Sequence, residues 1–238
     1  MGTRRLGVAL CGLILVSTIG AAESAYCQET AASVASRMRM HVENAGMHWT
    51  DEPIVNADQC ITRAAGTLGQ VQSLLVDLAG SEYAVAVTRV EMARAPDSLL
   101  HHGTPLLVTI TAHLVAHDDE ATRRERWTMP ALFTLVLRSA VQSQQTVVME
   151  GKVGDGAFHI EGRTHGANGA APIVKGLDAG PSKLVTAAEI KQSRTVEGVP
   201  DQRTRTQNKE NLVVSFIVSG TYSAQNLSVD ALKAMSYQ

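Results

Sequence analysis

The sequence is poor in aromatic residues and has no surplus of basic ones. Phe, Tyr and Trp make up 4% of the 238 residues, whereas hydrophobic residues as a whole make up 45%. A buried core must therefore consist mainly of Val, Leu, Ile, Ala and Met. The 21 Lys and Arg residues face 23 Asp and Glu, for a formal net charge of −2. Such a chain has no long-range attraction for nucleic acid or anionic lipid, and we expect no nucleic acid as a partner.

The motifs of common hydrolases and nucleotide-binding proteins are also missing. The chain has no Gly-x-Ser-x-Gly, Ser-x-x-Lys or His-Glu-x-x-His sequence. The glycines at 151, 154 and 156 fall in a predicted hairpin, whereas a phosphate-binding loop links a strand to a helix. His113 and His117 lie on a predicted strand, about 13 Å apart, too far for one zinc ion whose ligands sit at about 2 Å. We expect no metal and no cofactor.

One long hydrophobic run occurs, and it lies at residues 6–19. Arg4 and Arg5 precede it, and the small residues Gly20, Ala21 and Ala22 follow it. This order is typical of a secretory signal peptide, with cleavage expected after Ala22. We therefore expect residues 1–22 to be a leader and the protein to be secreted or periplasmic, with no membrane span after cleavage. The alternative is that residues 6–22 remain as an uncleaved anchor.

The chain has 3 cysteines, and Cys11 falls inside the expected leader. The other two are Cys27 and Cys60. In an oxidising compartment a pair is the expected outcome, so we predict a disulfide between them. The alternative is two separately buried free thiols.

Hydrophobic periodicity predicts helices at the two ends of the chain and strands between them. The predicted helices are residues 30–45, 57–79, 182–194 and 228–235. The predicted strands are residues 82–93, 105–117, 127–141, 146–153, 157–164 and 211–223, with a hairpin turn around the Gly154-Asp155-Gly156 sequence. Residues 165–181 and 199–209 are predicted to be loops.

This order of elements indicates an α+β fold, because helices and strands are segregated along the chain. We expect an antiparallel sheet of about six strands, either open or cupped, with the N-terminal helices and a C-terminal helix packed on one face. After the leader, residues 23–80 form a helical segment and residues 81–238 form the sheet, with a loop-rich insertion at 165–209. The two parts are expected to make one domain.

The sequence favours a non-enzymatic exported protein that acts as a carrier, a binding protein or an envelope-assembly accessory. Its partner would be a hydrophobic ligand or another envelope protein. If the sheet is concave, four side chains are candidates for ligand binding: Trp127, Met129, Phe133 and Phe216. The alternative is a secreted hydrolase whose site is assembled from dispersed His and carboxylate residues, with His113 and His159 as candidates.

Two groups of basic residues are candidates for contact with a protein partner. The first precedes the predicted strand at 127 and contains Arg123, Arg124 and Arg126. The second lies in the predicted loop at 199–209 and contains Arg203, Arg205 and Lys209. The second group suits a purely structural or assembly role.

Overall fold

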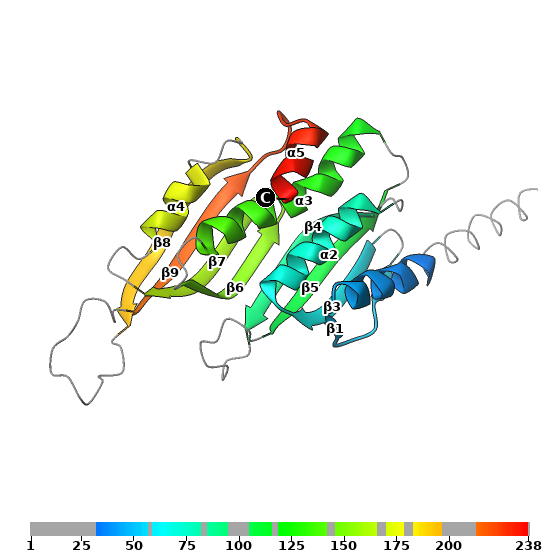
Figure 1. Ribbon diagram of the computed structural model, residues 1–238, viewed down its shortest axis with the longest axis horizontal. Coiled ribbons are helices and arrows are strands. Elements are labelled where there is room, and N and C mark those ends of the chain that lie inside the picture. Colours follow the sequence, from blue (N-terminus) through cyan, green and yellow to red (C-terminus); the bar gives the residue numbers. More distant parts are fainter. Residues whose placement is uncertain are drawn as a thin grey trace, which may run out of the picture.

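The computed structural model describes a two-layer α+β fold. It covers residues 32–56, 59–81, 85–94, 105–115, 119–141, 146–165, 170–178, 183–196 and 213–237. A nine-stranded antiparallel sheet forms one layer, and five helices cover one of its faces (Figure 1). The predicted α+β class with an antiparallel sheet is confirmed, but the prediction of about six strands is too low.

The described residues contain five helices and nine strands. The helices are residues 32–44, α2 (Leu68–Gly80), α3 (Glu120–Val141), α4 (Ala171–Asp178) and α5 (Val229–Ser236). The strands are β1 (His48–Trp49), β2 (Ile54–Asn56), β3 (Gln59–Gly66), β4 (Val85–Arg94), β5 (Leu106–Leu114), β6 (Thr146–Gly154), β7 (Ala157–His165), β8 (Val185–Val196) and β9 (Val213–Tyr222).

The strand order divides the sheet into two halves that are each continuous in sequence. The order is β1-β3-β5-β4-β6-β7-β9-β8, and β2 also pairs with β3. The two halves meet where β4 pairs with β6, and five residue pairs form this junction, between Arg89–Ala93 and Glu150–Gly154. The helix α3 leads from β5 to β6 and so crosses the junction.

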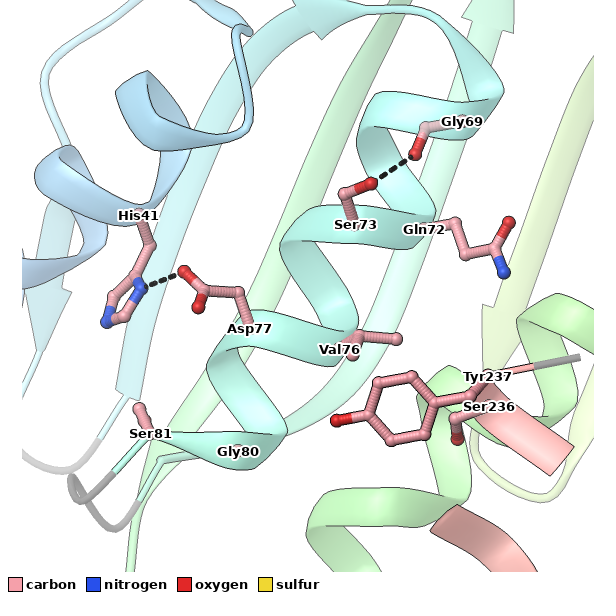
Figure 2. A pocket seen from close by; sticks show the side chains of 10 residues that line it. All are labelled: His41, Gly69, Gln72, Ser73, Val76, Asp77, Gly80, Ser81, Ser236 and Tyr237. Atoms are coloured by element: carbon pink, nitrogen blue, oxygen red, sulfur yellow. Dashed lines mark hydrogen bonds and ion pairs between the residues drawn. The ribbon is translucent and has the colours of Figure 1, made fainter. Parts of the chain in front are cut away.

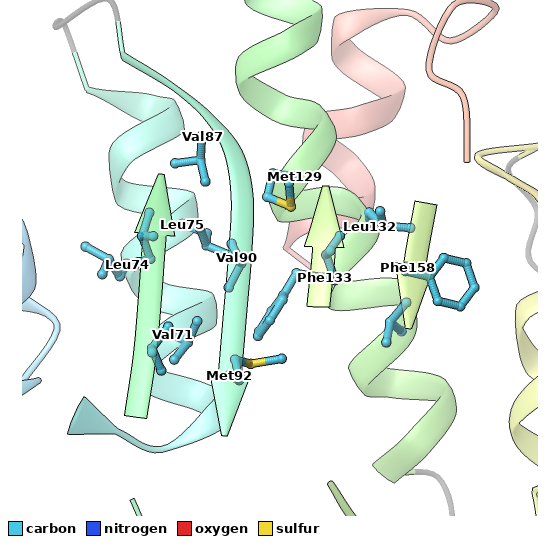
Figure 3. Packing of buried hydrophobic residues seen from close by; sticks show 14 of the residues in the cluster. Val71, Leu74, Leu75, Val87, Val90, Met92, Met129, Leu132, Phe133 and Phe158 are labelled. Carbon is cyan, nitrogen blue, oxygen red and sulfur yellow. The ribbon is translucent and has the colours of Figure 1, made fainter. Parts of the chain in front are cut away.

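The core lies between the sheet and the helices. In the central strands alternate residues face the helices, as in β5, where Val108, Ile110 and Ala112 are buried. Figure 3 shows how side chains from β4, α2 and α3 pack together in this layer, with Phe133 of α3 beside Val90 of β4. The strand predictions at 82–93, 105–117, 146–153, 157–164 and 211–223 are therefore confirmed, as are the helices near both ends.

The predicted strand at 127–141 is wrong, because this segment is part of the 22-residue helix α3. The helix begins after Asp119, whose Oδ1 accepts a hydrogen bond from the backbone N–H of Thr122 at 2.8 Å. It packs against α2, α4, α5 and the sheet, and nearly every residue from Arg126 to Val136 is buried. A helix buried on nearly all sides shows no clear 3.6-residue period, and its sequence can imitate the alternation of a strand.

Three other predicted segments also differ from the structure. The segment 57–79 is not one helix, because β3 and α2 meet at Thr67 within it. The segment 182–194 forms most of the edge strand β8 and not a helix, and the predicted loop at 165–181 contains α4. The described side chains of β8 are mostly exposed, so no hydrophobic alternation marks it as a strand. Its pairing with β9 fixes its conformation.

Two reciprocal pairs of glycine and phenylalanine join β7 to β9. Phe158 lies opposite Gly220, and Gly162 lies opposite Phe216. A Cβ atom at Gly220 would come within 2.4 Å of Phe158 Cζ, and one at Gly162 within 2.6 Å of Phe216 Cζ. Each phenyl ring therefore occupies the space that a side chain on the neighbouring strand would need.

The face of the sheet away from the helices carries polar and charged side chains. At the junction of the two halves, Glu91 Oε1 accepts a hydrogen bond from Arg89 Nη2 at 2.9 Å. The same oxygen lies 3.3 Å from Lys152 Nζ. Partial burial raises the pKa of Glu91, but its hydrogen bond to Lys152 and the charges of Arg89 and Lys152 outweigh this, and the net pKa is lowered. On the neighbouring strands Glu150 lies directly opposite Glu161, so the hairpin does not pair opposite charges at this position.

The predicted leader and Cys27 lie outside the described residues. Cys60 is buried and carries no disulfide bond in the part of the chain that the structure describes. Burial raises the pKa of the Cys60 thiol, and a 3.7 Å contact with the Thr62 hydroxyl opposes this only in part. The predicted Cys27–Cys60 bridge is therefore not supported. None of the helices in the described residues has the length and hydropathy needed to cross a membrane.

Candidate functional site

A groove of about 890 Å³ lies over the outward side of α2 (Figure 2). The helix 32–44 supplies one lining residue, and the C-terminal end of α5 supplies two more. The lining residues are His41, Gly69, Gln72, Ser73, Val76, Asp77, Gly80, Ser81, Ser236 and Tyr237. Six of them recur on α2 at intervals of three and four, which places them on one side of the helix.

The sequence of α2 explains why this side faces outward. The opposite side is apolar and buried against the sheet, through Val71, Leu74, Leu75 and Leu78. The helix begins with a capping box, in which Thr67 Oγ1 accepts from the Gln70 backbone N–H and Gln70 Oε1 accepts from the Thr67 N–H at 2.8 Å. The Gln70 side chain also donates to the Gly46 carbonyl at 2.7 Å, which ties α2 to the end of helix 32–44.

Hydrogen bonds hold the opposite wall of the groove in place. Gln72 Nε2 donates to Thr134 Oγ1 of α3 at 3.1 Å, and Thr134 Oγ1 in turn donates to the Ser236 carbonyl of α5 at 3.3 Å. Tyr237 follows α5, and its ring lies 5.8 Å from the Trp127 ring, centroid to centroid. Tyr237 is 70% exposed, so its ring forms an accessible rim of the groove.

The charged group of the groove is Asp77, which a buried histidine holds. His41 Nδ1 lies 2.5 Å from Asp77 Oδ2, a distance at which the ring N–H donates to the carboxylate. His41 is 7% exposed, whereas the Asp77 side chain is 51% exposed. The other ring nitrogen, Nε2, is buried and has no hydrogen-bond partner. A rigid buried imidazole thus fixes the orientation of an accessible carboxylate.

The described contacts of His41 and Asp77 are not those of a Ser-His-Asp triad. A Ser-His-Asp site needs a hydroxyl hydrogen-bonded to the free imidazole nitrogen, but His41 Nε2 is buried without a partner. The nearby hydroxyls are engaged elsewhere, because Ser73 Oγ donates to the Gly69 carbonyl at 3.0 Å and Ser81 Oγ to the Leu78 carbonyl at 2.8 Å. Among the described residues no cluster of three or more His, Cys, Asp or Glu could hold a metal ion.

The four predicted ligand-binding side chains lie in the closed core. Trp127, Met129 and Phe133 belong to α3 and Phe216 to β9, and each is at most 5% exposed. Only Trp127 approaches the groove, through its contact with the Tyr237 ring and with Lys233 Nζ, which lies 5.5 Å from the centroid of the indole.

The three predicted basic contact residues on α3 do not form one exposed patch. Arg124 pairs with Glu120 at 3.0 Å on α3, and Arg126 is buried, with its guanidinium donating to the Ser81 carbonyl. Arg123 is exposed on the same helix. The other predicted contact residues, Arg203, Arg205 and Lys209, lie outside the described residues.

The two histidines proposed for a hydrolase lie on different strands of the sheet. His113 is on β5 and His159 on β7, and β4 and β6 lie between them. Three strand spacings of about 4.8 Å separate them by about 14 Å across the sheet, and the strand registers also place them five residues apart along β4, at Ala86 and Glu91. His159 Nδ1 is within 3.0 Å of Ser219 Oγ on the neighbouring strand. They cannot act on the same atom of a substrate.

Sequence reasoning did not single out His41 or Asp77. A signal existed for each of them. His41 falls beside Val34, Met38 and Val42 on the apolar side of the helix 32–44, where a polar residue is unusual. Asp77 is the only charged residue in α2. Their meeting depends on the fold, because 36 residues separate them.

No protein-family model, curated protein or solved structure matches this chain.

Proposed function

We propose that this is an exported, non-enzymatic accessory protein that holds a segment of a partner protein in the groove over α2. The observation that carries the proposal is the groove itself, whose polar lining is fixed by hydrogen bonds to α3, α5 and the helix 32–44. Preformed concave sites with a few oriented polar groups are typical of binding sites.

The shape of the groove favours a peptide segment over a small apolar ligand. From Gly69 to Gly80 the lining follows α2 for about 16 Å, at about 1.5 Å per helical residue. About five residues of an extended chain span this length, at roughly 3.3 Å each. A carrier of apolar molecules would need an apolar cavity, whereas the core aromatic residues Trp127, Phe133, Phe158 and Phe216 all lie within one buried hydrophobic cluster.

Export is the second part of the proposal and rests on the leader-like sequence at residues 1–22. N-terminal sequencing of the protein recovered from outside the cytoplasm should begin at Glu23. A sequence that begins at Met1 would show that the hydrophobic run is retained and would remove the cleaved-leader part of the proposal.

Position-specific photocrosslinking tests the binding function. A photoreactive residue at the exposed position Ser73, in the groove, should give a discrete adduct in cells that naturally make the protein. The same residue at Lys152, on the open face of the sheet, is the control and should not give that adduct.

A blocking substitution then separates the groove from other surfaces. Gly69→Trp fills open space in the groove, because a Cβ there meets nothing within 4 Å, and it should abolish the adduct. Leu107→Trp is the matched control, since Leu107 is 53% exposed on the open face. An adduct that survives Gly69→Trp, or that forms equally from Lys152, would refute the groove as the binding site.

A further inference from the structure

We infer that the groove takes a basic segment, with a Lys or Arg side chain of the partner bound at Asp77. This inference rests on the proposed function and names the chemistry of the ligand. It is carried by the charge of the groove, by the fixed orientation of its carboxylate and by the exposed aromatic ring on the opposite wall.

The groove carries one acidic side chain, Asp77, whose partner in the groove is the His41 ring. Its lining contains one carboxylate, that of Asp77, and no Lys or Arg. Asp77 lies in the last turn of α2, where the helix dipole is negative, and this turn contains no basic residue. Two basic side chains near the residues of the groove contact other groups: Arg126 donates to the carbonyl of the lining residue Ser81, and Lys233 lies over the Trp127 ring. A cation from a partner would therefore satisfy a charge that the chain leaves exposed.

The carboxylate is held ready for such a contact. Oδ2 of Asp77 accepts from His41 Nδ1, so the second oxygen remains for a ligand while half of the side chain stays exposed. Because His41 is buried, Asp77 loses little freedom when a ligand binds. Preorganisation of this kind raises affinity by lowering the entropy cost of binding.

The rest of the groove suits the apolar stem of a long basic side chain. Figure 2 shows the Tyr237 ring extending from the end of α5 toward Val76 and the outward side of α2. An exposed aromatic ring attracts a cation at its face, and Lys and Arg can lay their methylene groups along apolar surface. A single carboxylate with an aromatic neighbour suits one ammonium or guanidinium group better than a divalent metal ion, which takes several oxygen ligands.

Peptide binding to the full exported chain tests the inference. The probes are three dye-labelled hexapeptides of alternating residues, Ala with Lys, Ala with Ser, and Ala with Glu, measured by fluorescence anisotropy at low and at physiological salt. The Lys peptide should bind at least tenfold more tightly than the Glu peptide, with the Ser peptide between them. Its affinity should fall as salt is raised, because salt screens the attraction.

Three variants identify Asp77 as the source of the preference. Asp77→Asn keeps an oxygen for His41 but removes the charge, and it should weaken binding of the Lys peptide about threefold to tenfold with little effect on the Ser peptide. Asp77→Glu should retain the preference. Asp230→Asn removes the same charge from an exposed position on α5 outside the groove and should have no effect. Circular dichroism checks that each variant is folded.

The outcomes distinguish this inference from the proposed function. If the Ser73 adduct forms but the three peptides bind equally, or Asp77→Asn and Asp230→Asn act alike, the groove binds a partner of another charge and the inference is wrong. If the Ser73 adduct does not form and no peptide binds, the proposed function itself fails.

Discussion

The glycine–phenylalanine pairs between β7 and β9 make a quantitative prediction about stability. A Cβ atom at Gly220 would lie 2.2 Å from the Ala187 carbonyl oxygen and 2.4 Å from Phe158 Cζ. Ordinary contacts begin near 3.4 Å, so the backbone of β8 or β9 must move by about 1 Å. Overpacking in a core typically costs about 1–3 kcal/mol. Because a backbone atom is among those in the way, we expect Gly220→Ala to lower the free energy of unfolding by about 3 kcal/mol.

Thermal and urea unfolding followed by circular dichroism measures this effect. For a protein of this size about 3 kcal/mol corresponds to a fall in Tm of about 6–12 °C. Gly69→Ala is the matched control, because its Cβ meets nothing within 4 Å. A helical Gly→Ala change should stabilise the protein by up to about 1 kcal/mol. If Gly220→Ala leaves Tm unchanged, or the two variants shift it in the same direction, the packing described for β7, β8 and β9 is wrong.

Three further predictions concern single side chains. Cys60 should resist iodoacetamide in the native protein and react in denaturant without reductant, as mass spectrometry would show; reaction only after reduction would establish a disulfide instead. The Glu91→Gln variant should be less stable at pH 7 by less than about 1 kcal/mol. The pKa of Glu91 is lower in the folded protein than in the unfolded chain, where it is near 4.3, so ionised Glu91 stabilises the fold above that pH. This stabilisation is lost as pH falls and the folded carboxylate is protonated, so the difference between the variant and the natural protein should disappear at pH below about 4. A pH-independent difference in urea titrations would contradict this account. Thr67→Ala should cost about 0.5–2 kcal/mol through loss of the cap of α2, whereas an unchanged urea midpoint would show that tertiary packing alone fixes the start of the helix.

The parts of the fold that sequence reasoning could predict are those with one buried side and one exposed side. The alternation of β5 was readable because Val108 and Ile110 face the core while Thr109 and Thr111 do not. The β6–β7 hairpin was readable because its turn needs two left-handed residues, and Asp155 at φ 55° and Gly156 at φ 74° supply them.

The segments whose secondary structure was predicted wrongly are buried on most of their sides or exposed on almost all of them. The helix α3 is enclosed by neighbours, and the edge strand β8 is mostly exposed, so neither has a clear periodicity. The groove could not be predicted because its parts are distant in sequence. His41, Asp77 and Tyr237 come together only after the helix 32–44, α2 and α5 have packed on one sheet. The unusual polar position of His41 and the single charge of α2 at Asp77 do not by themselves show that the two side chains meet.

Ligand binding in the groove should affect the pairing of β4 with β6, where the two halves of the sheet meet. This junction is the only strand pairing that joins the two halves among the described residues, and its five residue pairs make it shorter than the neighbouring pairings. Of the lining residues, Asp77 lies on α2, which belongs in sequence to the first half of the sheet, whereas Tyr237 follows α5, after the last strand of the second half. A bound segment would contact Asp77 and Tyr237 together, and it would thereby stabilise the pairing of the two halves of the sheet at β4 and β6. Filling the groove should therefore slow amide hydrogen exchange in β4 and β6, in strands that the ligand never touches.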